Sequence, residues 1–381
     1  MNFTFHTTPA IIFRDGALAE IGDALDARFK RPVLITDKGL VAAGICAPAL
    51  ASLKEKGRDA FVFDDVAADP PAAKVKDAVA AARAHRADSV IAIGGGSSMD
   101  TAKVVAVLLN SDATLEEIYG TGMVKTARAP LALAPTTAGT GSEVTSISVI
   151  TAEDDTKIAV VDDALYPDIA ILDSSVTHGL PRAATAATGI DAMVHAIEAY
   201  TNIHRKNPVS DALAREALML LYGNIVRACE APHDAGARRA MMLGAMLAGQ
   251  AFANSPVGAV HAMAYPLGGI FHIPHGLSNS LMLEPVLRFN APNAAQHYAE
   301  LAPCVGAQAS GDATSDCDAF IARVIEIVEA TGVERRLSQL GISHNDLPRM
   351  AEDALKGQRI LQNNPRVVSY DDALRMYQEV L

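Results

Sequence analysis

Hydrophobic and polar residues recur with two different periods along this chain of 381 residues. In the first half, short apolar runs at 32–36, 60–65, 89–96 and 130–136 are rich in β-branched residues and predict strands. Between them, residues 72–85 have the polar and apolar spacing of an amphipathic helix. Strands that alternate with helices indicate βαβ units and a mostly parallel sheet.

In the second half, apolar positions recur at helical spacing and strand-like runs fade. The segments rich in Ala, Leu and Met are 182–202, 208–229, 237–253 and 314–331. Pro181 and Arg182 are expected to form a hinge and a helix start, since proline is favoured in a first turn. The sequence therefore predicts an α/β nucleotide-binding domain at 1–180 and an all-α domain at 181–381. We expect a ligand cleft between them.

The composition is that of a globular protein, with 50% hydrophobic and 20% charged residues. A net charge of −12 without a basic stripe argues against nucleic acid and anionic membranes as partners. The N-terminal segment lacks the pattern of a signal peptide, and the apolar run 104–109 is too short to span a bilayer. The four cysteines show no metal or disulfide spacing, so we expect reduced thiols in a soluble, cytoplasmic protein.

A glycine-rich segment, GGGSSMDTAK at 94–103, directly follows the predicted strand at 89–93. Glycines let the backbone approach a pyrophosphate, and the following helix offers free N–H groups and a positive dipole end. The residues expected to hold the phosphates are Gly94, Gly95, Gly96, Ser97 and Ser98. Met99 stands where GxGxxG has its third glycine, so the Rossmann fingerprint is absent. A glycine-rich turn with a serine helix cap is the alternative.

A second hydroxyl-rich loop, PTTAGTGSEVT at 135–145, follows the predicted strand at 130–136. Its candidate donors to a diphosphate or a nicotinamide ribose are Thr136, Thr137, Thr140 and Ser142. An ordinary Thr/Ser/Gly turn is the alternative. Asp37 ends the strand at 32–36, where a carboxylate accepts hydrogen bonds from an adenosine ribose and repels a 2′-phosphate. This favours NAD over NADP, although a turn-forming Asp in TDKG explains the residue equally well.

Three histidines and one aspartate form a candidate metal site. Asp191 and His195 are four residues apart, so in a helix they project from one face. His261 and His275 are 14 residues apart on a Gly/Pro-rich stretch. Mixed imidazole and carboxylate ligands suit Fe²⁺ or Zn²⁺. Without a metal, Asp191 and His195 form a helix pair in which the carboxylate orients the imidazole.

Together these motifs resemble the iron-containing (group III) alcohol dehydrogenase family over nearly the whole chain. Both loops, the four metal-ligand positions and the NNPR segment near the C-terminus occur in the family's order and rough spacing. The resemblance implies a dehydroquinate synthase-like architecture, NAD as cofactor and Fe²⁺ at the quartet, with zinc in some relatives. It also implies the reaction: the ion lowers the pKa of an alcohol oxygen or polarises an aldehyde carbonyl, and hydride is exchanged with the nicotinamide.

The resemblance also implies further site residues. They are Asp100 and Lys157 on the cofactor side, and Ile147 and Phe252 on the substrate side. The substrate-side pair suits a short, fairly apolar alcohol. Tyr265 stands four residues after His261, where several family members have a second histidine. The catalytic proton relay is therefore open between Tyr265 and His272, which lies three residues before His275.

Other functions also fit parts of the pattern. A zinc-dependent polyol dehydrogenase of the glycerol dehydrogenase kind would share the metal ligands. A dehydroquinate synthase-like lyase needs a basic pocket near the metal, which the residues around His261 and His275 do not supply. A non-enzymatic nucleotide sensor needs no complete quartet. We expect an NAD(H)-linked enzyme for a small primary alcohol or aldehyde, as a homodimer or larger homo-oligomer paired through the β-like stretch 3–13.

Overall fold

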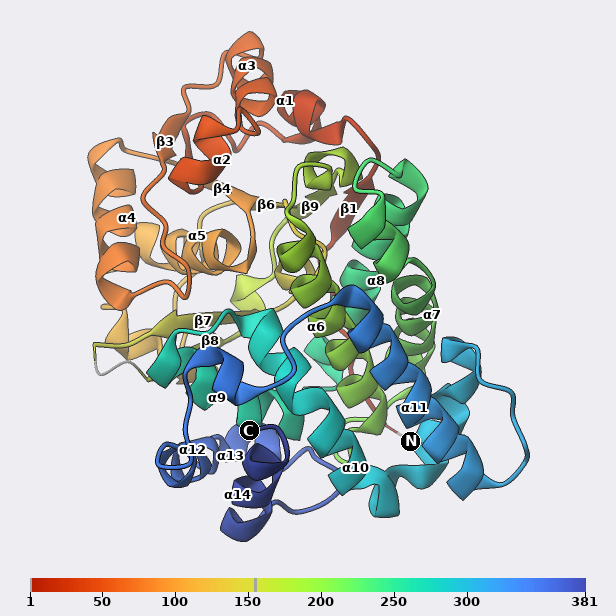
Figure 1. The fold of residues 1–381 in the computed structure, drawn as a ribbon. Coiled ribbons are helices and arrows are strands. Elements are labelled where there is room, and N and C mark those ends of the chain that lie inside the picture. Colours follow the sequence, from red (N-terminus) through yellow and green to blue (C-terminus); the bar gives the residue numbers. More distant parts are fainter. Residues whose placement is uncertain (1, 154–155) are drawn as a thin grey trace. The chain divides into compact units, whose positions relative to one another are not determined.

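The computed structural model describes residues 2–153 and 156–381 (Figure 1). Two compact units are present. One contains His6–Thr137 and Gly141–Gly179, and the other contains Leu180–Leu381 together with Ala138–Thr140 and a short N-terminal piece that ends at Phe5. The main division falls between Gly179 and Leu180.

The first unit is built on a six-stranded sheet with the order β1-β9-β6-β4-β2-β3. All its pairs are parallel. The strands are β1 (Ala10–Phe13), β2 (Pro32–Ile35), β3 (Phe61–Phe63), β4 (Ser89–Gly94), β6 (Leu131–Pro135) and β9 (Ile169–Leu172). The four strands predicted from the apolar runs and the parallel arrangement are confirmed.

The N-terminal stretch differs from its prediction. Only Ala10–Phe13 forms a strand, and it pairs with β9 of the same chain. Residues 2–8 have no regular structure. Pro9, directly before the strand, has no N–H group for a sheet ladder. A second sheet was also missed; it consists of β5 (Gly120–Thr121), β7 (Ile147–Thr151) and β8 (Lys157–Val161), with β7 and β8 antiparallel.

Helices cover both faces of the six-stranded sheet. Successive side chains of a strand point to opposite faces, and Val90 and Ala92 of β4 belong to one core whereas Ile91 and Ile93 belong to another. The first core contains α4 (Ala72–Ala84) and α5 (Gly96–Leu109); the second contains residues of α3 (Ala47–Glu55) and α1 (Ile21–Ala24). The predicted helix at 72–85 is confirmed. The remaining helix is α2 (Lys38–Ala42), with short 3₁₀ turns at Ala17–Glu20, Glu116–Ile118, Ser142–Val144, Asp163–Leu165 and Ser174–Thr177.

The second unit is helical, as predicted (green to blue in Figure 1). Its elements are α6 (Arg182–Thr201), α7 (Pro208–Glu230), α8 (Ala235–Asn254), α9 (Ala259–Phe271), α10 (His275–Leu301), α11 (Ala313–Thr331), α12 (Leu347–Ala354), α13 (Gln358–Leu361) and α14 (Tyr370–Glu379), with 3₁₀ turns at Ala302–Val305 and Leu337–Leu340. The four helices expected from periodicity, α6, α7, α8 and α11, are confirmed.

Helix α9 lies on the Gly/Pro-rich stretch that carries His261 and His275, and α10 begins at the last residue of that stretch. Pro266 is inside α9, and Pro285 and Pro292 are inside α10. A proline removes one backbone hydrogen bond from a helix, but both helices bury long apolar faces, so tertiary packing outweighs that loss. Within the described residues, no helix is long and apolar enough to cross a membrane.

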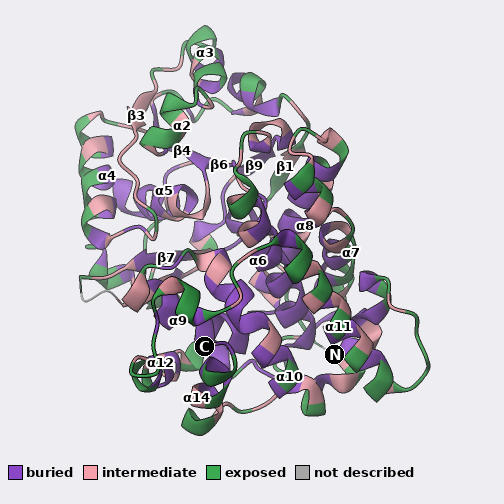
Figure 2. Cartoon of the chain, in the orientation of Figure 1, coloured by how far each residue is buried: buried purple, intermediate pink, exposed green. Residues whose placement is uncertain are grey.

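The most buried helix of this unit is α6. From Gly189 to Thr201 every side chain on all its faces is buried (Figure 2). A helix that is buried all round lies in the core of a bundle, and α7, α8 and α10 contact α6. The polar side chains of Asp191, His195 and Glu198 are therefore held in a closely packed interior.

Candidate metal centre and nucleotide loops

The four predicted metal ligands come together within the helical unit. Asp191 and His195 lie one turn apart on α6, His261 is the third residue of α9, and His275 is the first residue of α10. One ligand atom from each lies within 4.8 Å of all the others. The Asp191 Oδ1 atom is 3.9 Å from Nε2 of His195, 3.9 Å from Nε2 of His261 and 3.6 Å from Nε2 of His275.

Gly276 explains how α10 comes close enough to α6. A Cβ atom on Gly276 would lie 2.5 Å from the carbonyl oxygen of Ala187 and 2.7 Å from its carbon. Real side chains do not tolerate such distances, so only glycine allows this backbone contact. The contact places His275, the preceding residue, beside the Asp191 carboxylate.

Distances and charge states both fit a divalent cation. Ligand atoms about 2.1 Å from a shared ion lie roughly 3.4 to 4.2 Å apart. The separations of 3.6 and 3.9 Å from Asp191 lie in this range, and the other pairs, within 4.8 Å, need only a small inward shift of the side chains. Burial lowers the pKa of His195 to about 3, so this imidazole is neutral. Burial raises the pKa of Asp191, but the three histidines and Asn279 outweigh this effect and lower it below its usual value. Neutral imidazoles and an ionised carboxylate are the forms that bind a metal.

Two residues that the sequence analysis missed contact the ligands. Glu198 on α6 accepts a hydrogen bond from Nδ1 of His261 through Oε2 at 2.6 Å. Asn279 on α10 donates from Nδ2 to Asp191 Oδ1 at 2.5 Å. A signal for both was present, because Glu198 follows His195 by one helical turn and Asn279 follows His275 by one turn.

One aromatic ring, that of Phe252, packs directly against the quartet. The ring of Phe252 on α8 stacks on the His195 ring, with centroids 4.3 Å apart and an interplanar angle of 21°. Tyr265 is half-buried on α9, one turn after His261. His272 is exposed and ends α9 as its C-cap with a left-handed φ of 55°. The fourth residue expected near the substrate, Ile147, begins β7 in the other unit.

The glycine-rich segment forms a strand-to-helix turn, as the motif suggested. Gly94 ends β4, Gly95 is the N-cap of α5, and Gly96 begins that helix. A Cβ atom on Gly94 would lie 2.4 Å from Oγ of Ser98, so glycine is required for the first turn of α5 to fold back on the strand. The Ser97 hydroxyl accepts a hydrogen bond from the backbone N–H of Asp69.

The hydroxyl-rich loop contains one buried group that the protein leaves without a partner. Within residues 2–153 and 156–381, Thr137 Oγ1 is buried and has no hydrogen bond. A Cβ atom on Gly95 would lie 3.6 Å from this side chain, so Thr137 faces the glycine-rich turn. Buried hydroxyls normally have a hydrogen-bond partner. This hydroxyl therefore fits a bound ligand. Thr136 is also buried, and Thr140 belongs to the helical unit.

Other predicted cofactor residues make hydrogen bonds inside the α/β unit. Asp100 Oδ1 accepts from Oγ of Ser142 at 2.7 Å, and its Oδ2 accepts from the backbone N–H of Val149 at 2.9 Å. Lys157 forms an ion pair with Asp69 Oδ1 at 2.8 Å and donates a hydrogen bond to Oγ1 of Thr151 on β7 at 2.9 Å. These contacts tie the glycine-rich turn to the small sheet.

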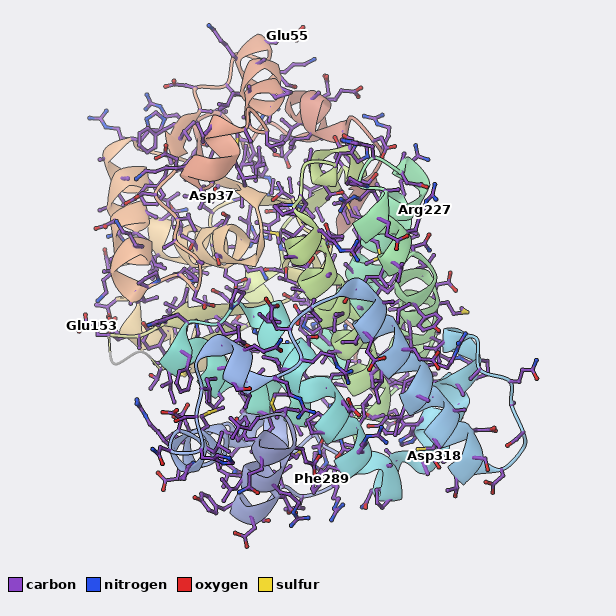
Figure 3. All side chains as sticks on the ribbon, viewed as in Figure 1. Asp37, Glu55, Glu153, Arg227, Phe289 and Asp318 are labelled. Carbon is purple, nitrogen blue, oxygen red and sulfur yellow. The ribbon has the colours of Figure 1, made fainter. Side chains whose placement is uncertain are left out.

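Asp37 has a local structural role, as expected if it is the turn-forming residue of TDKG. It is labelled in Figure 3. It is the N-cap of α2 and accepts a hydrogen bond from the backbone N–H of Leu40 at 3.0 Å. This contact occupies Oδ1 and neither requires nor prevents a ribose contact.

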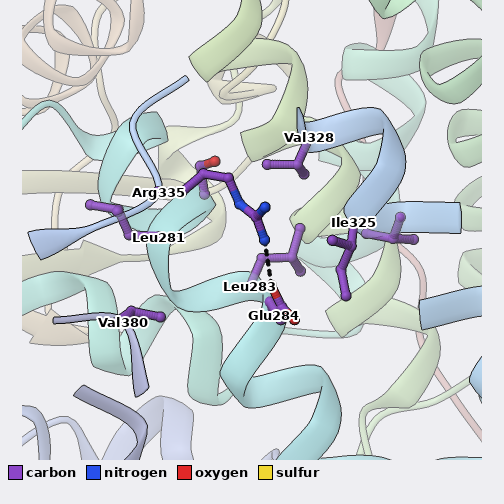
Figure 4. Close-up of a pocket in the computed structure, with 9 residues that line it drawn as sticks. Leu281, Leu283, Glu284, Ile325, Val328, Arg335 and Val380 are labelled. Atoms are coloured by element: carbon purple, nitrogen blue, oxygen red, sulfur yellow. Dashed lines mark hydrogen bonds and ion pairs between the residues drawn. The ribbon is translucent and has the colours of Figure 1, made fainter. Parts of the chain in front are cut away.

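A small cavity lies elsewhere in the helical unit, between side chains of α10 and α11 (Figure 4). Its volume is about 30 Å³. A hydrogen bond of 2.7 Å from the Arg335 guanidinium to Glu284 Oε2 lies at one side of it. None of the residues that line it belongs to the metal quartet. Room for one or two water molecules is too little for an alcohol or a nucleotide.

The chain is similar to known dehydrogenases along its length. Residues 8–174 match the family model of iron-containing alcohol dehydrogenases, and residues 185–381 match the model of the C-terminal part of the Fe-containing alcohol dehydrogenase family. Long-chain-alcohol dehydrogenase 1 of Geobacillus thermodenitrificans is 38% identical over 355 residues, which cover 92% of this chain and 89% of that protein.

Solved structures show the same similarity. A 1,3-propanediol oxidoreductase is 32% identical with a TM-score of 0.96, and the match covers 100% of both chains. Sulfoacetaldehyde reductase from Bifidobacterium kashiwanohense, solved in complex with NAD⁺, is 29% identical with a TM-score of 0.88 over 100% of this chain and 99% of that one.

The fold and the metal quartet define a metal-dependent dehydrogenase that uses a nicotinamide cofactor. The chain belongs to the iron-containing alcohol dehydrogenase family. It is an alcohol dehydrogenase that uses NAD and iron as cofactors. The comparisons do not favour the glycerol dehydrogenase-like or lyase alternatives.

Proposed function

We propose that the enzyme acts on a short, largely apolar primary alcohol or its aldehyde at an Fe²⁺ site formed by Asp191, His195, His261 and His275. The convergence of the four ligand atoms within 4.8 Å carries this proposal. Zinc has compatible ligand preferences and is the alternative metal.

The side chains of the helical unit perform distinct tasks in this proposal. The quartet holds the ion, which when bound acidifies the alcohol or polarises the aldehyde while NAD exchanges hydride. Phe252 covers the His195 imidazole with a ring that is 8% exposed, which keeps water from this side of the ligand. Tyr265 shapes the pocket one turn from His261, and Ile147 is proposed to contact the apolar part of the substrate. We propose His272, which is exposed, as the residue that exchanges the proton with solvent.

The cofactor contacts that we propose lie around the β4–α5 turn and the hydroxyl-rich loop. Gly94, Gly95 and Gly96 let the backbone approach the pyrophosphate, and α5 offers its N-terminal N–H groups. The unpaired hydroxyl of Thr137 supports a direct contact. The remaining proposed cofactor residues are Ser97, Ser98, Asp100, Thr136, Thr140, Ser142 and Lys157, with Asp37 at the adenosine ribose.

We further propose a cytoplasmic enzyme that forms a homodimer or a larger homo-oligomer. Four buried cysteines without disulfides are typical of a reducing compartment. At one end of the six-stranded sheet, β1 presents an edge to which a second copy can add a strand.

A substrate panel tests the activity. Protein stripped with a chelator and reloaded with Fe²⁺ or Zn²⁺ is assayed with NAD and NADP against primary alcohols of increasing length, secondary alcohols, vicinal diols and the matching aldehydes. We expect the highest kcat/KM for a short primary alcohol or its aldehyde with NAD(H) and Fe²⁺. Higher kcat/KM for vicinal diols with Zn²⁺ would favour the polyol dehydrogenase instead.

A further inference from the structure

The NNPR turn, residues 363–366, lies against the start of the helix that carries His261. Asn364 Oδ1 accepts a hydrogen bond from the backbone N–H of Ala259, the first residue of α9, at 3.3 Å. Asn363 Nδ2 donates to the carbonyl of Val257 at 3.0 Å. More than 100 residues of sequence separate the partners of each bond.

Glu198 reaches the same helix start from α6. Its Oε1 accepts from the backbone N–H of Val260 at 2.6 Å, and its Oε2 accepts from Nδ1 of His261 at 2.6 Å. The Glu198 side chain is 6% exposed. A buried carboxylate at a helix N-terminus is stabilised by the free N–H groups and by the helix dipole.

These contacts replace a local helix cap. The N-cap of α9 is Gly258, which has no side chain to accept from the first N–H groups. Residues from α6 and from the NNPR turn accept those hydrogen bonds instead. The position of the α9 start therefore depends on tertiary contacts, and His261 lies two residues after that start.

The same turn is also bound to the helix that carries His275. Asn364 Nδ2 donates to Oδ1 of Asn290 on α10 at 2.7 Å. Arg366 donates to the carbonyl of Phe289 at 2.9 Å, and its guanidinium lies 4.1 Å from the centre of that ring (Phe289 is labelled in Figure 3). The three helices that supply metal ligands are thus linked by Glu198 and Asn364.

We propose that Glu198 and Asn364 are positioning residues of the metal centre. Glu198 orients the His261 ring so that Nε2 points toward the other three ligand atoms, and Asn364 fixes the start of α9 relative to α10. This inference rests on the proposed metal site. Partners that orient a ligating histidine typically contribute about 10- to 100-fold to metal affinity.

The test compares Co²⁺ binding in three variants with the wild-type protein. Glu198→Gln is nearly isosteric. Its amide oxygen can accept from either the Val260 N–H or His261 Nδ1, and its NH₂ group cannot accept from the other. Asn364→Ala removes the second contact. Asn207→Ala is the control, because Asn207 is a buried N-cap of α7, in the same unit, and that helix has no metal ligand. The measurements are the Co²⁺ dissociation constant from chelator competition, the d–d absorption spectrum and the melting temperature.

We expect the Co²⁺ dissociation constant to rise about 10- to 100-fold in Glu198→Gln and Asn364→Ala, with an altered d–d spectrum in Glu198→Gln. Asn207→Ala should lower the melting temperature but keep the wild-type affinity and spectrum. If both site variants have the same Co²⁺ affinity and spectrum as Asn207→Ala, the inference is wrong but the proposed metal site is unaffected. Absence of Co²⁺ binding by the wild-type protein would overturn both. If Asn364→Ala does not fold, Glu198→Gln decides.

Discussion

Lys103 and Ser142, 39 residues apart in the sequence, are joined by a hydrogen bond of 2.9 Å from Nζ to Oγ in the interior of the α/β unit. The Lys103 ammonium group also donates to Thr145 Oγ1 at 2.9 Å and to the carbonyl of Ile147 at 2.7 Å. Its three N–H groups thus hold the end of the hydroxyl-rich loop against α5. Burial lowers the pKa of Lys103 to about 8, against the opposing effect of Asp100 and Glu143.

Replacing Lys103 should destabilise the α/β unit. In Lys103→Met the Ile147 carbonyl loses a buried donor, so we expect a loss of about 3 kcal/mol in the free energy of unfolding, measured with urea. Lys54→Met, at an exposed position of α3, is the matched control and should stay within about 0.5 kcal/mol of wild type. A loss in Lys103→Met as small as that of the control would contradict the structural role.

The difference in unfolding free energy between the wild-type protein and Lys103→Met should depend on pH in a defined direction. The pKa of Lys103 falls from 10.5 to about 8 on folding. Between these values the unfolded chain holds a proton that the folded chain releases, so the contribution of Lys103 to stability grows as pH rises and is lost as pH falls through 8. The stability advantage of wild type over Lys103→Met should therefore increase from pH 8 to pH 10.5. A constant difference would show that this lysine has a normal pKa in the folded protein.

Removing one metal ligand should abolish turnover without preventing cofactor binding. The quartet lies in the helical unit, whereas the glycine-rich turn lies in the other unit. We expect His261→Ala and His275→Ala to lose bound metal, measured by elemental analysis, and to bind NADH with nearly wild-type affinity, measured by fluorescence. His204→Ala, at an exposed position of the same unit, should keep both properties. Full activity with stoichiometric metal in either ligand variant would remove that histidine from the site.

Two substitutions of Asp37 distinguish the effect of its negative charge from its effect as a helix cap. Asp37→Asn keeps an oxygen that can accept from Leu40 but loses the negative charge, whereas Asp37→Gly loses both. If the carboxylate repels a 2′-phosphate, both variants should improve kcat/KM for NADP relative to NAD by about ten-fold or more, equivalent to roughly 1.4 kcal/mol. An unchanged ratio in both variants would place Asp37 outside the ribose site.

Tyr265 lies one helical turn after His261, where its phenol should shape the pocket. A phenol with a pKa near about 10 is a poor proton acceptor at neutral pH. We therefore expect Tyr265→Phe to keep its metal and most of kcat, and Tyr265→Ala to change KM and the preference among alcohols. A loss of kcat by roughly a hundred-fold in Tyr265→Phe, with metal intact, would instead assign the hydroxyl a role in proton transfer.

The sequence by itself determined the features that depend on neighbouring residues. Strands β2, β3, β4 and β6 and helices α6, α7, α8 and α11 follow from local periodicity. The pairing of Asp191 with His195 also follows, because residues four apart share one face of a helix. The glycine-rich turn was predictable because it has a strand before it and a helix after it.

Tertiary structure decided everything that joins distant segments. Pro266 obscured α9, which forms because its apolar residues are buried. Gly276 brings His275 to α6 through a backbone contact that no local pattern shows. Glu198 and Asn364 accept hydrogen bonds from the start of α9 across 62 and 105 residues. A buried polar group takes whichever partner the packed helices bring within about 3 Å, and sequence separation carries no information about that distance.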